Sequence, residues 1–333
     1  MPKRVGFSYW GFCEELYDSS VIDTPDGGRY SRPILAKKFQ EVGFDIICLQ
    51  QRREMKPLSF LQFSEGFPEL DAIFLEWRWP TYKNDINHPD FGRRAYEPDL
   101  DRQRDILKHY YGRVPIVIFD TDLKLQFPNF IEKESLHKNG VVVCEPAIFH
   151  SHFAEFLPYW SDFKPVFNRV SLSKRAHVYI GSNYERYWGV EKYYFSVAKN
   201  LRNAHIDVAT TIRGNWLDES PERPEQMQKV EMYSSYIDFF PRANIWDSFH
   251  ELANAIATTH IGKMSYMRVG NVASRFTESI VCNTPGLVPS EFLIPIYGHD
   301  WIVYSPEDVI EKLLYLRTVN DDGRDEIVAS QAA

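Results

Sequence analysis

The sequence contains few cysteines, no long apolar run and no excess of positive charge. Its four cysteines, at positions 13, 48, 144 and 282, form no C-x-x-C pair, which argues against a disulfide framework or a structural zinc site and favours a reducing cytosol. No stretch is long enough to span a membrane, and the charged MPKR start is followed by no apolar segment of signal-peptide type. We therefore expect a cytoplasmic protein without membrane contacts.

Two ligand-binding patterns are absent as well. The turn after the first expected strand reads FSYWGF, with a single glycine, whereas a dinucleotide-binding turn needs G-x-G-x-x-G. The ten histidines are scattered, and His150 with His152 does not have a metal-ligand spacing on one helix face. Asp120-Thr121-Asp122 matches a D-x-D metal site literally, but it lies in the first half of the chain, away from the donor helix described below. We expect neither NAD nor a required divalent metal.

What the sequence does contain is an alternation of short β-rich runs with helical stretches, which is typical of right-handed βαβ units and a mainly parallel sheet. In the first half, the expected strands are Val5–Trp10, Ile46–Gln50, Ala72–Trp77, Ile116–Asp120 and Val141–Glu145. The expected helices there are Pro33–Val42, Asp99–Tyr111 and Ala147–Phe156.

The same alternation restarts in the second half. The expected strands are His177–Gly181, Asp207–Ile212, Tyr236–Phe239, Ala257–Ile261, Gly286–Val288 and Trp301–Tyr304. The expected helices are Val190–Leu201, Asn244–Ala255, Val272–Val281 and Pro306–Leu316. Lys164–Lys174 is the expected linker. The 333 residues thus predict two Rossmann-like domains, residues 1–165 and 166–318, facing across a central cleft, with a frayed tail at 319–333.

The most specific segment is Ser274-Arg275-Phe276-Thr277-Glu278, which begins a predicted helix after a polar loop. Arg275 and Glu278 are three residues apart and so share one helix face. An arginine fork beside the free amides of a helix start suits a diphosphate, and a carboxylate one turn later suits the two hydroxyls of a ribose. The alternative is a solvated Arg–Glu pair. This arrangement resembles the R-x-x-E donor-binding helix of GT-B glycosyltransferases, which implies those two roles for Arg275 and Glu278.

Three further loops follow predicted strands of the second half. Gly181-Ser182 ends one strand, and glycine there lets the backbone approach a ligand closely, with Arg186 within reach of the same pocket. A plain strand-to-helix turn is the alternative. Gly214 lies in the next loop and Phe240 in the one after it. The GT-B resemblance implies that the loop with Phe240 contacts the nucleotide base, whereas ordinary core packing is the alternative for this ring.

In the first half, two carboxylates, Asp120 and Asp122, end a buried strand. An inverting sugar transfer needs one base to remove the acceptor's proton, and a strand's carboxyl end is where it would lie; turn capping is the alternative role for either residue. Glu76 and Arg78 share one face of another strand end, and we interpret them as a wall contacting acceptor or sugar, with a structural ion pair as the alternative. Basic loops with Arg93 and Arg94, and with Arg29 and Arg32, suit an anionic acceptor, although exposed loops commonly hold arginine.

The order of these segments resembles the phage DNA β-glucosyltransferase family over nearly the whole chain. The resemblance rests on the strand ending in Gly181-Ser182, the R-x-x-E helix and the segment Thr121–Leu125 (TDLKL), which resembles the family's F-T-D-I-R-L strand end. It implies Asp122 as the catalytic base, a UDP-sugar donor and, as acceptor, a 5-hydroxymethylated pyrimidine flipped out of duplex DNA. The family's arginines after the Gly-Ser strand are more numerous than the single Arg186 here.

Two other classes of function remain open from the sequence. One is a GT-B transferase acting on a polysaccharide, a spore-coat component or a small molecule, which the formal net charge of −8 favours over a DNA acceptor. The R-x-x-E helix also occurs in spore-maturation-type transferases and does not separate the two. The other is a non-catalytic nucleotide-sugar binder.

Overall fold

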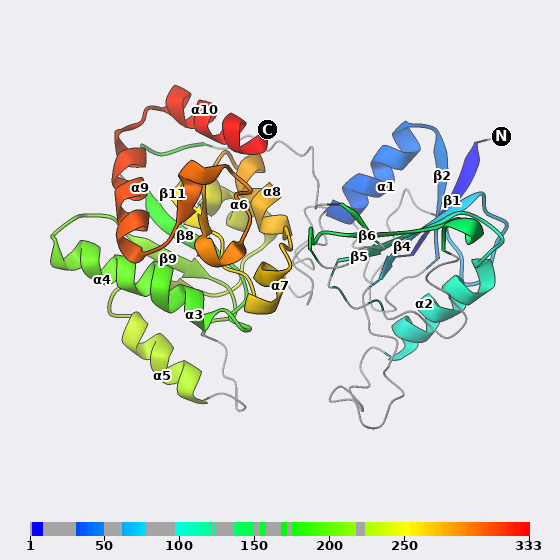
Figure 1. The fold of residues 1–333 in the computed structure, drawn as a ribbon, viewed down its shortest axis with the longest axis horizontal. Helices are drawn as coiled ribbons and strands as arrows, with labels where there is room; N and C mark the ends of the chain where they lie inside the picture. The colour runs from blue at the N-terminus through cyan, green and yellow to red at the C-terminus, as the bar shows by residue number, and fades with distance from the viewer. Residues whose placement is uncertain are drawn as a thin grey trace. The chain divides into compact units, whose positions relative to one another are not determined.

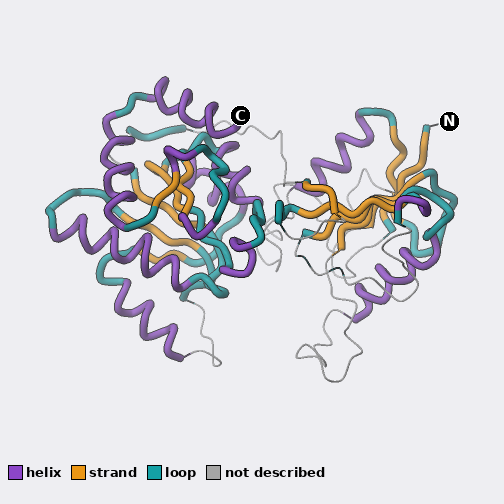
Figure 2. Tube along the Cα trace, in the orientation of Figure 1, coloured by secondary structure: helices purple, strands orange, loops and turns teal. Residues whose placement is uncertain are grey.

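A computed structural model describes residues 2–8, 31–49, 62–77, 97–121, 123, 125, 136–149, 154–157, 168–171, 175–217 and 224–333. The chain divides into two compact units, Met1–Pro158 and Tyr159–Ala333 (Figure 1). In both units the strands lie between helices (Figure 2).

The first unit is built on a seven-stranded sheet in the order β3-β2-β1-β4-β5-β6-β7, and every neighbouring pair is parallel. Its strands are β1 (Lys3–Ser8), β2 (Phe44–Cys48), β3 (Gln62–Phe63), β4 (Ala72–Trp77), β5 (Ile116–Asp120), β6 (Val141–Glu145) and β7 (Ala154–Phe156), and its helices are α1 (Ser31–Glu41) and α2 (Glu97–Tyr110).

Helices α1 and α2 cover opposite faces of this sheet (Figure 1). The two-residue period of a strand explains the division, because successive side chains point to opposite faces. In β4, Phe74 packs in one core cluster with Ala36 of α1, whereas Ile73 and Leu75 pack in another with Leu107 of α2. The strand sequences are apolar on both faces for this reason.

The second unit is built on a six-stranded, all-parallel sheet in the order β10-β9-β8-β11-β12-β13. Its strands are β8 (Ala176–Ile180), β9 (Thr210–Arg213), β10 (Asp238–Phe240), β11 (Ala255–Thr259), β12 (Gly286–Pro289) and β13 (Ile302–Val303). Its helices are α3 (Tyr187–Val190), the π-helical turn η6 (Glu191–Phe195), α4 (Ser196–Asn203), α5 (Pro224–Tyr233), α6 (Ile245–Ala253), α7 (Met264–Arg268), α8 (Ser274–Val281), α9 (Pro306–Thr318) and α10 (Asp321–Ala332).

In both sheets the first strand lies in the middle, and the order in which strands are added reverses once. This is the doubly wound order of Rossmann-like domains. The chain builds outward through three strands on one side and then returns to continue on the other, so β1 lies beside β4 and β8 lies beside β11. Open sheets of this kind bind ligands at the carboxyl ends of the two strands where the order reverses. The predicted pair of Rossmann-like units is confirmed, and the second switch point lies between β8 and β11.

One predicted helix is wrong. Of the segment Ala147–Phe156, the last three residues form the edge strand β7, which pairs with β6 through Val143 opposite Ala154 and Glu145 opposite Phe156. A strand of three residues is too short to show a two-residue period, so its conformation is decided by its pairing with β6 and not by local pattern.

The prediction of a frayed tail at residues 319–333 is also wrong. Residues Asp321–Ala332 form α10, whose first turn is capped by the Asn320 side chain. Arg324 is buried and donates from Nε to the carbonyl of Asn283, at 2.7 Å, and from Nη1 to that of Ala255, at 2.9 Å. Burial lowers the pKa of Arg324 to about 9. Few residues of α10 are apolar, so its sequence showed no sign of a packed helix. The helix is held in place by hydrogen bonds from Arg324 to carbonyl groups that are distant in the sequence.

Candidate functional site

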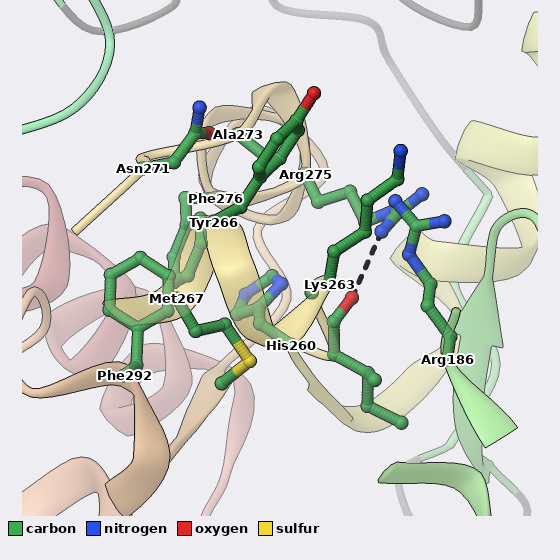
Figure 3. A pocket seen from close by; sticks show the side chains of 12 residues that line it. Arg186, His260, Lys263, Tyr266, Met267, Asn271, Ala273, Arg275, Phe276 and Phe292 are labelled. Carbon is green, nitrogen blue, oxygen red and sulfur yellow. Dashed lines mark hydrogen bonds between the residues drawn. The ribbon is translucent and has the colours of Figure 1, made fainter. Parts of the chain in front are cut away.

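A pocket lies at the carboxyl ends of β8 and β11, where the strand order of the second sheet reverses. It is lined by residues that follow β8 and β11 and by residues of α7, α8 and the turn after β12. Figure 3 shows that its two sides differ in character, with the apolar side chains of Met267, Phe276 and Phe292 on one side and three cationic side chains on the other. A crevice at this position is where ligands of doubly wound sheets bind.

The three cationic side chains are Arg186, Lys263 and Arg275, and Figure 3 shows their charged ends gathered together. The guanidinium of Arg275 donates from Nη1 to the carbonyl of Ile261 at 3.1 Å and lies over the ring of Tyr179, 5.4 Å from its centroid. Burial, followed by repulsion from Arg275, lowers the pKa of Arg186. Like charges held together at a half-buried position gain stability from an anion placed between them.

Two glycines make room for this arrangement. A methyl group at position 181 would lie 2.7 Å from a terminal guanidinium nitrogen of Arg275, and one at position 214 would lie 2.1 Å from the carbonyl oxygen of Gly181. Gly214 also has φ of +151°, in the region that favours glycine. The backbone at 181 is therefore in close contact with Arg275 on one side and with the backbone at 214 on the other.

Helix α8 begins at the pocket. Its N-cap is Ala273, a lining residue that cannot accept a hydrogen bond through its methyl group, and the described residues give the helix no side-chain cap. The Phe276 amide donates to the Ala273 carbonyl at 3.1 Å, so among the described contacts of this eight-residue helix the amides of Ser274 and Arg275 are left for another acceptor. Together with Arg275, the second residue of the helix, they suit an anion such as a phosphate.

No protein-family model and no curated protein matches the sequence. Solved structures do match it. T4 phage β-glucosyltransferase in complex with UDP and Mn²⁺ aligns with a TM-score of 0.61 at 15% identity, over 99% of this chain and 96% of that chain. An α-glucosyltransferase in complex with UDP and a 13-mer DNA containing an HMU base aligns with a TM-score of 0.58 at 11% identity, over 99% and 95% of the two chains.

The chain has the GT-B fold. A structure of T4 phage β-glucosyltransferase with its UDP-glucose substrate matches as well, with a TM-score of 0.58 at 14% identity, over 98% of this chain and 93% of that chain. The predicted structural resemblance to the phage DNA glucosyltransferases is therefore confirmed over nearly the full length. At such identities the likeness establishes the fold, whereas function depends on the residues of the site.

The GT-B fold brings several of the predicted donor residues together. Arg186 and Arg275 both line the pocket although they are far apart in the sequence, and Gly181 lies against Arg275. Gly214 contacts Gly181 and donates its amide to the carbonyl of Phe240 at 3.1 Å. The Phe240 ring is 38% exposed, so it is not a core residue, and the guanidinium of Arg213 lies 5.1 Å from its centroid.

The predicted donor residues Ser182 and Glu278 do not line the pocket either. The Ser182 hydroxyl accepts a hydrogen bond from the amide of Tyr184 at 3.1 Å, which shapes the loop after β8. Glu278 is half-buried one turn beyond Arg275 on α8. Their roles in holding a ribose or phosphate stay predictions.

Sequence reasoning missed His260, Lys263, Tyr266 and Asn271, all of which line the pocket. The signal that could have found them is Gly262-Lys263, which directly follows the predicted strand Ala257–Ile261. This is the fourth strand of the second domain, and in the doubly wound order it lies beside the first, so its loop faces the ligand.

A substitution at Gly214 tests how tightly the strand ends are packed. In Gly214→Ala, the new methyl group meets the Gly181 carbonyl and the residue is forced to a strained φ, so we expect a loss of about 2–4 kcal/mol of folding free energy. Gly298→Ala is the matched control, because φ there is +88° but no atom lies within 4 Å, and it should cost about 1 kcal/mol. Urea unfolding of both variants measures the difference; equal losses would refute the close packing at Gly214.

Two buried histidines make the second unit sensitive to acid. Burial lowers the pKa of His177 to about 3, and burial followed by repulsion from Arg275 lowers that of His260 to about 3. The folded protein keeps both rings neutral while the unfolded chain takes up protons below its ordinary pKa of about 6.5. Stability is thus complete above pH 6.5 and falls as the pH drops towards 3, by about 2 kcal/mol per histidine at pH 5.

Unfolding midpoints in urea between pH 7.5 and 5 measure this effect. In His177→Gln, the slope of the unfolding free energy against pH should decrease by the equivalent of about one proton. In His299→Gln, a change at an exposed position, this slope should stay the same. Identical slopes in all three proteins would contradict the assignment.

In the first unit, Glu76 and Asp120 are buried at the carboxyl ends of β4 and β5. The Thr121 hydroxyl donates to Glu76 Oε1 at 3.3 Å, and Asp120 Oδ2 accepts from the Leu125 amide at 2.6 Å. Asp120 therefore caps the turn after β5, which is the alternative role considered for it. The predicted base Asp122 and the predicted acceptor residues Arg78, Arg93 and Arg94 lie outside the described residues.

Within the described ranges, no group of three or more His, Cys, Asp or Glu side chains is placed to hold a metal ion. Over the same ranges, no helix has the length and apolar character needed to cross a membrane.

Proposed function

We propose that this protein is a glycosyltransferase that moves a sugar from a UDP-sugar to the hydroxymethyl group of a modified pyrimidine in DNA. The observation that carries the proposal is the pocket at the β8–β11 switch point, where Arg186, Arg275 and the uncapped start of α8 converge. The full-length likeness to the T4 phage enzyme in complex with UDP-glucose supports it.

The donor is held by its diphosphate. The forked guanidinium of Arg275 and the charge of Arg186 bind the phosphate oxygens, and the first amides of α8 add further donors. The nucleoside lies towards Gly214 and Phe240, with its ribose hydroxyls on Glu278. When the bond between the anomeric carbon and the phosphate oxygen breaks, the leaving UDP carries the additional negative charge, and the same cations stabilise it.

Asp122 is the base of the reaction. Its carboxylate removes the proton from the acceptor's hydroxymethyl oxygen as that oxygen attacks the anomeric carbon, and the displacement inverts the configuration. Asp120 is not suited to this role, because it is buried and its carboxylate caps the turn that ends at Leu125.

The acceptor assignment is supported by one of the matching structures, an α-glucosyltransferase in complex with UDP and a 13-mer DNA that contains an HMU base. A duplex offers a hydroxymethyl group to an enzyme only when the nucleotide is flipped out of the stack. Arg78, Arg93 and Arg94 are the residues that we propose to contact the acceptor. Glu76 is buried and accepts a hydrogen bond from the Thr121 hydroxyl, so we propose that it supports this wall from behind. Because the whole protein carries a formal charge of −8, DNA binding must depend on a local basic surface and fall steeply with salt.

A second candidate is a GT-B transferase with a non-DNA acceptor, such as a polysaccharide or small molecule. The formal net charge of −8 favours it, since an acidic surface repels a polyanion.

Mass spectrometry of nucleosides tests the proposal. The protein is incubated with a panel of UDP-sugars and duplex DNA that contains 5-hydroxymethylcytosine or 5-hydroxymethyluracil, with unmodified duplex as the matched control. A glycosylated nucleoside from the modified duplex alone supports the DNA assignment and identifies the sugar. Slow hydrolysis of one UDP-sugar without a DNA product would overturn the DNA acceptor and favour the second candidate; no binding of any nucleotide would overturn the transferase assignment.

A further inference from the structure

Strands β8 and β11 separate before they reach the pocket. Their pairing joins Ala176 to Ala255 and His177 to Ala257, with a shift of register between these two positions. Beyond this point the link between the strands passes through the hydroxyl of Tyr194, which reaches them from the π-helical turn η6. We propose that Tyr194 is a positioning residue that sets the width of the donor crevice and thereby places Arg275, an inference that rests on the proposed role of Arg275 in donor binding.

The Tyr194 hydroxyl takes the place of a direct hydrogen bond between the strands. The amide of Thr259, in β11, donates to it at 2.8 Å. The hydroxyl oxygen lies 3.1 Å from the carbonyl of Val178, in β8, and 2.9 Å from the carbonyl of Thr259. Since a phenol has one proton, it donates to one of these carbonyls at a time. Neighbouring parallel strands ordinarily bond amide to carbonyl directly, so an inserted hydroxyl holds them further apart.

The ring of Tyr194 is held on both sides. It is fully buried and stacks on the imidazole of His177, with ring centroids 4.1 Å apart and an interplanar angle of 6°. His177 Nε2 is in turn hydrogen-bonded to the Thr259 hydroxyl at 2.9 Å. Tyr179 contacts the Tyr194 ring edge-on at 5.6 Å. A side chain fixed in this way acts as a rigid spacer between the two strands.

Just beyond the spacer, the Arg275 guanidinium lies between the two strand ends. On the β11 side it donates to the carbonyl of Ile261 at 3.1 Å, and on the β8 side it lies so close to Gly181 that a methyl group there would be 2.7 Å from it. Ile261 is two residues beyond Thr259, and Gly181 is three residues beyond Val178. Without the hydroxyl, the Thr259 amide and the Val178 carbonyl are left buried without partners. They can bond again only by approaching each other, which narrows the space that Arg275 occupies.

The test is a double-mutant cycle on UDP binding by the full chain, measured by calorimetry. Tyr194→Phe keeps the ring and removes the hydroxyl, and it should raise the Kd for UDP by about tenfold, as expected for one misplaced charge-assisted contact. Arg275→Lys removes the guanidinium fork but leaves binding measurable. If Tyr194 acts through Arg275, the double variant binds UDP no more weakly than Arg275→Lys alone.

Controls separate positioning from general loss of stability. Leu313→Ala removes a fully buried side chain of the same core cluster and should lower the melting temperature without changing the Kd for UDP. If Tyr194→Phe does not fold, Thr259→Val replaces it in the cycle. This milder change removes the hydroxyl that holds the His177 ring, and it should cause a smaller loss of UDP affinity that likewise does not add to that of Arg275→Lys.

Equal UDP affinity of wild type and Tyr194→Phe, or losses that add in full with Arg275→Lys, would overturn this inference alone. A wild-type protein that binds no UDP would overturn the proposed function, and the inference with it.

Discussion

Asp122→Asn should abolish most turnover while leaving UDP binding intact. Asparagine has nearly the same shape as aspartate but cannot take the acceptor's proton, and a positioned base contributes about 10²–10⁴-fold to such a step. We therefore expect kcat to fall by about that factor, with the Kd for UDP within twofold of wild type. Single-turnover transfer and calorimetry measure the two quantities separately.

Asp120→Asn is the matched control for this prediction. Asp120 accepts the Leu125 amide in the turn after β5, and an asparagine oxygen can still accept that hydrogen bond, so turnover should change little. Loss of turnover in Asp120→Asn with normal turnover in Asp122→Asn would reverse the assignment of the base. If Asp122→Asn instead lost UDP binding, the Asp120-Thr121-Asp122 segment would act on the donor as a D-x-D site. A non-catalytic nucleotide-sugar binder would be unaffected by either substitution.

Arg275→Ala should weaken UDP binding by roughly 100-fold, or about 3 kcal/mol, since it removes a forked cation from the diphosphate. It should not weaken the fold. The Arg275 charge helps to lower the pKa of Arg186, so removing it relieves a repulsion, and the melting temperature should stay equal or rise. Such an exchange of stability for affinity is typical of binding sites.

Arg268→Ala is the control for Arg275→Ala, because Arg268 is exposed at the end of α7 and does not line the pocket. Its affinity for UDP should equal that of wild type. Unchanged UDP affinity in Arg275→Ala would mean that the cationic side of the pocket does not bind the diphosphate, and the assignment of this pocket to the donor would be wrong.

The fold supports the donor side of the proposed reaction more directly than the acceptor side. The residues proposed for the donor lie on the second unit, and their contacts are described, whereas Asp122 and the arginines proposed for the acceptor rest on the sequence. Shared fold at 15% identity or less does not carry over an acceptor. The nucleoside assay and the Asp122 variant are for this reason the experiments that decide the chemistry.

Local pattern in the sequence was sufficient to predict most strands and helices. Apolar runs such as Ile116–Asp120, separated by helical stretches, predicted two parallel sheets, because βαβ connections force that arrangement. The helix start at Ser274-Arg275 was likewise visible, since Arg275 and Glu278 lie three residues apart on it. Chemistry that lies within a few residues of chain can be recognised from residue type and spacing alone.

Tertiary structure decided which of these segments meet. The strand order places Gly181 and Ile261 on either side of Arg275, and no local pattern states how far apart two strand ends lie. Tyr194 lies within the predicted helix Val190–Leu201, and nothing in that local pattern singles it out; its hydroxyl can join β8 and β11 only because the two strands separate next to it. Helix α10 has the composition of a tail, yet the carbonyls that bind Arg324 come from residues 253, 255 and 283. Long-range contacts of this kind depend on packing between distant segments, which is why only the folded chain determines them.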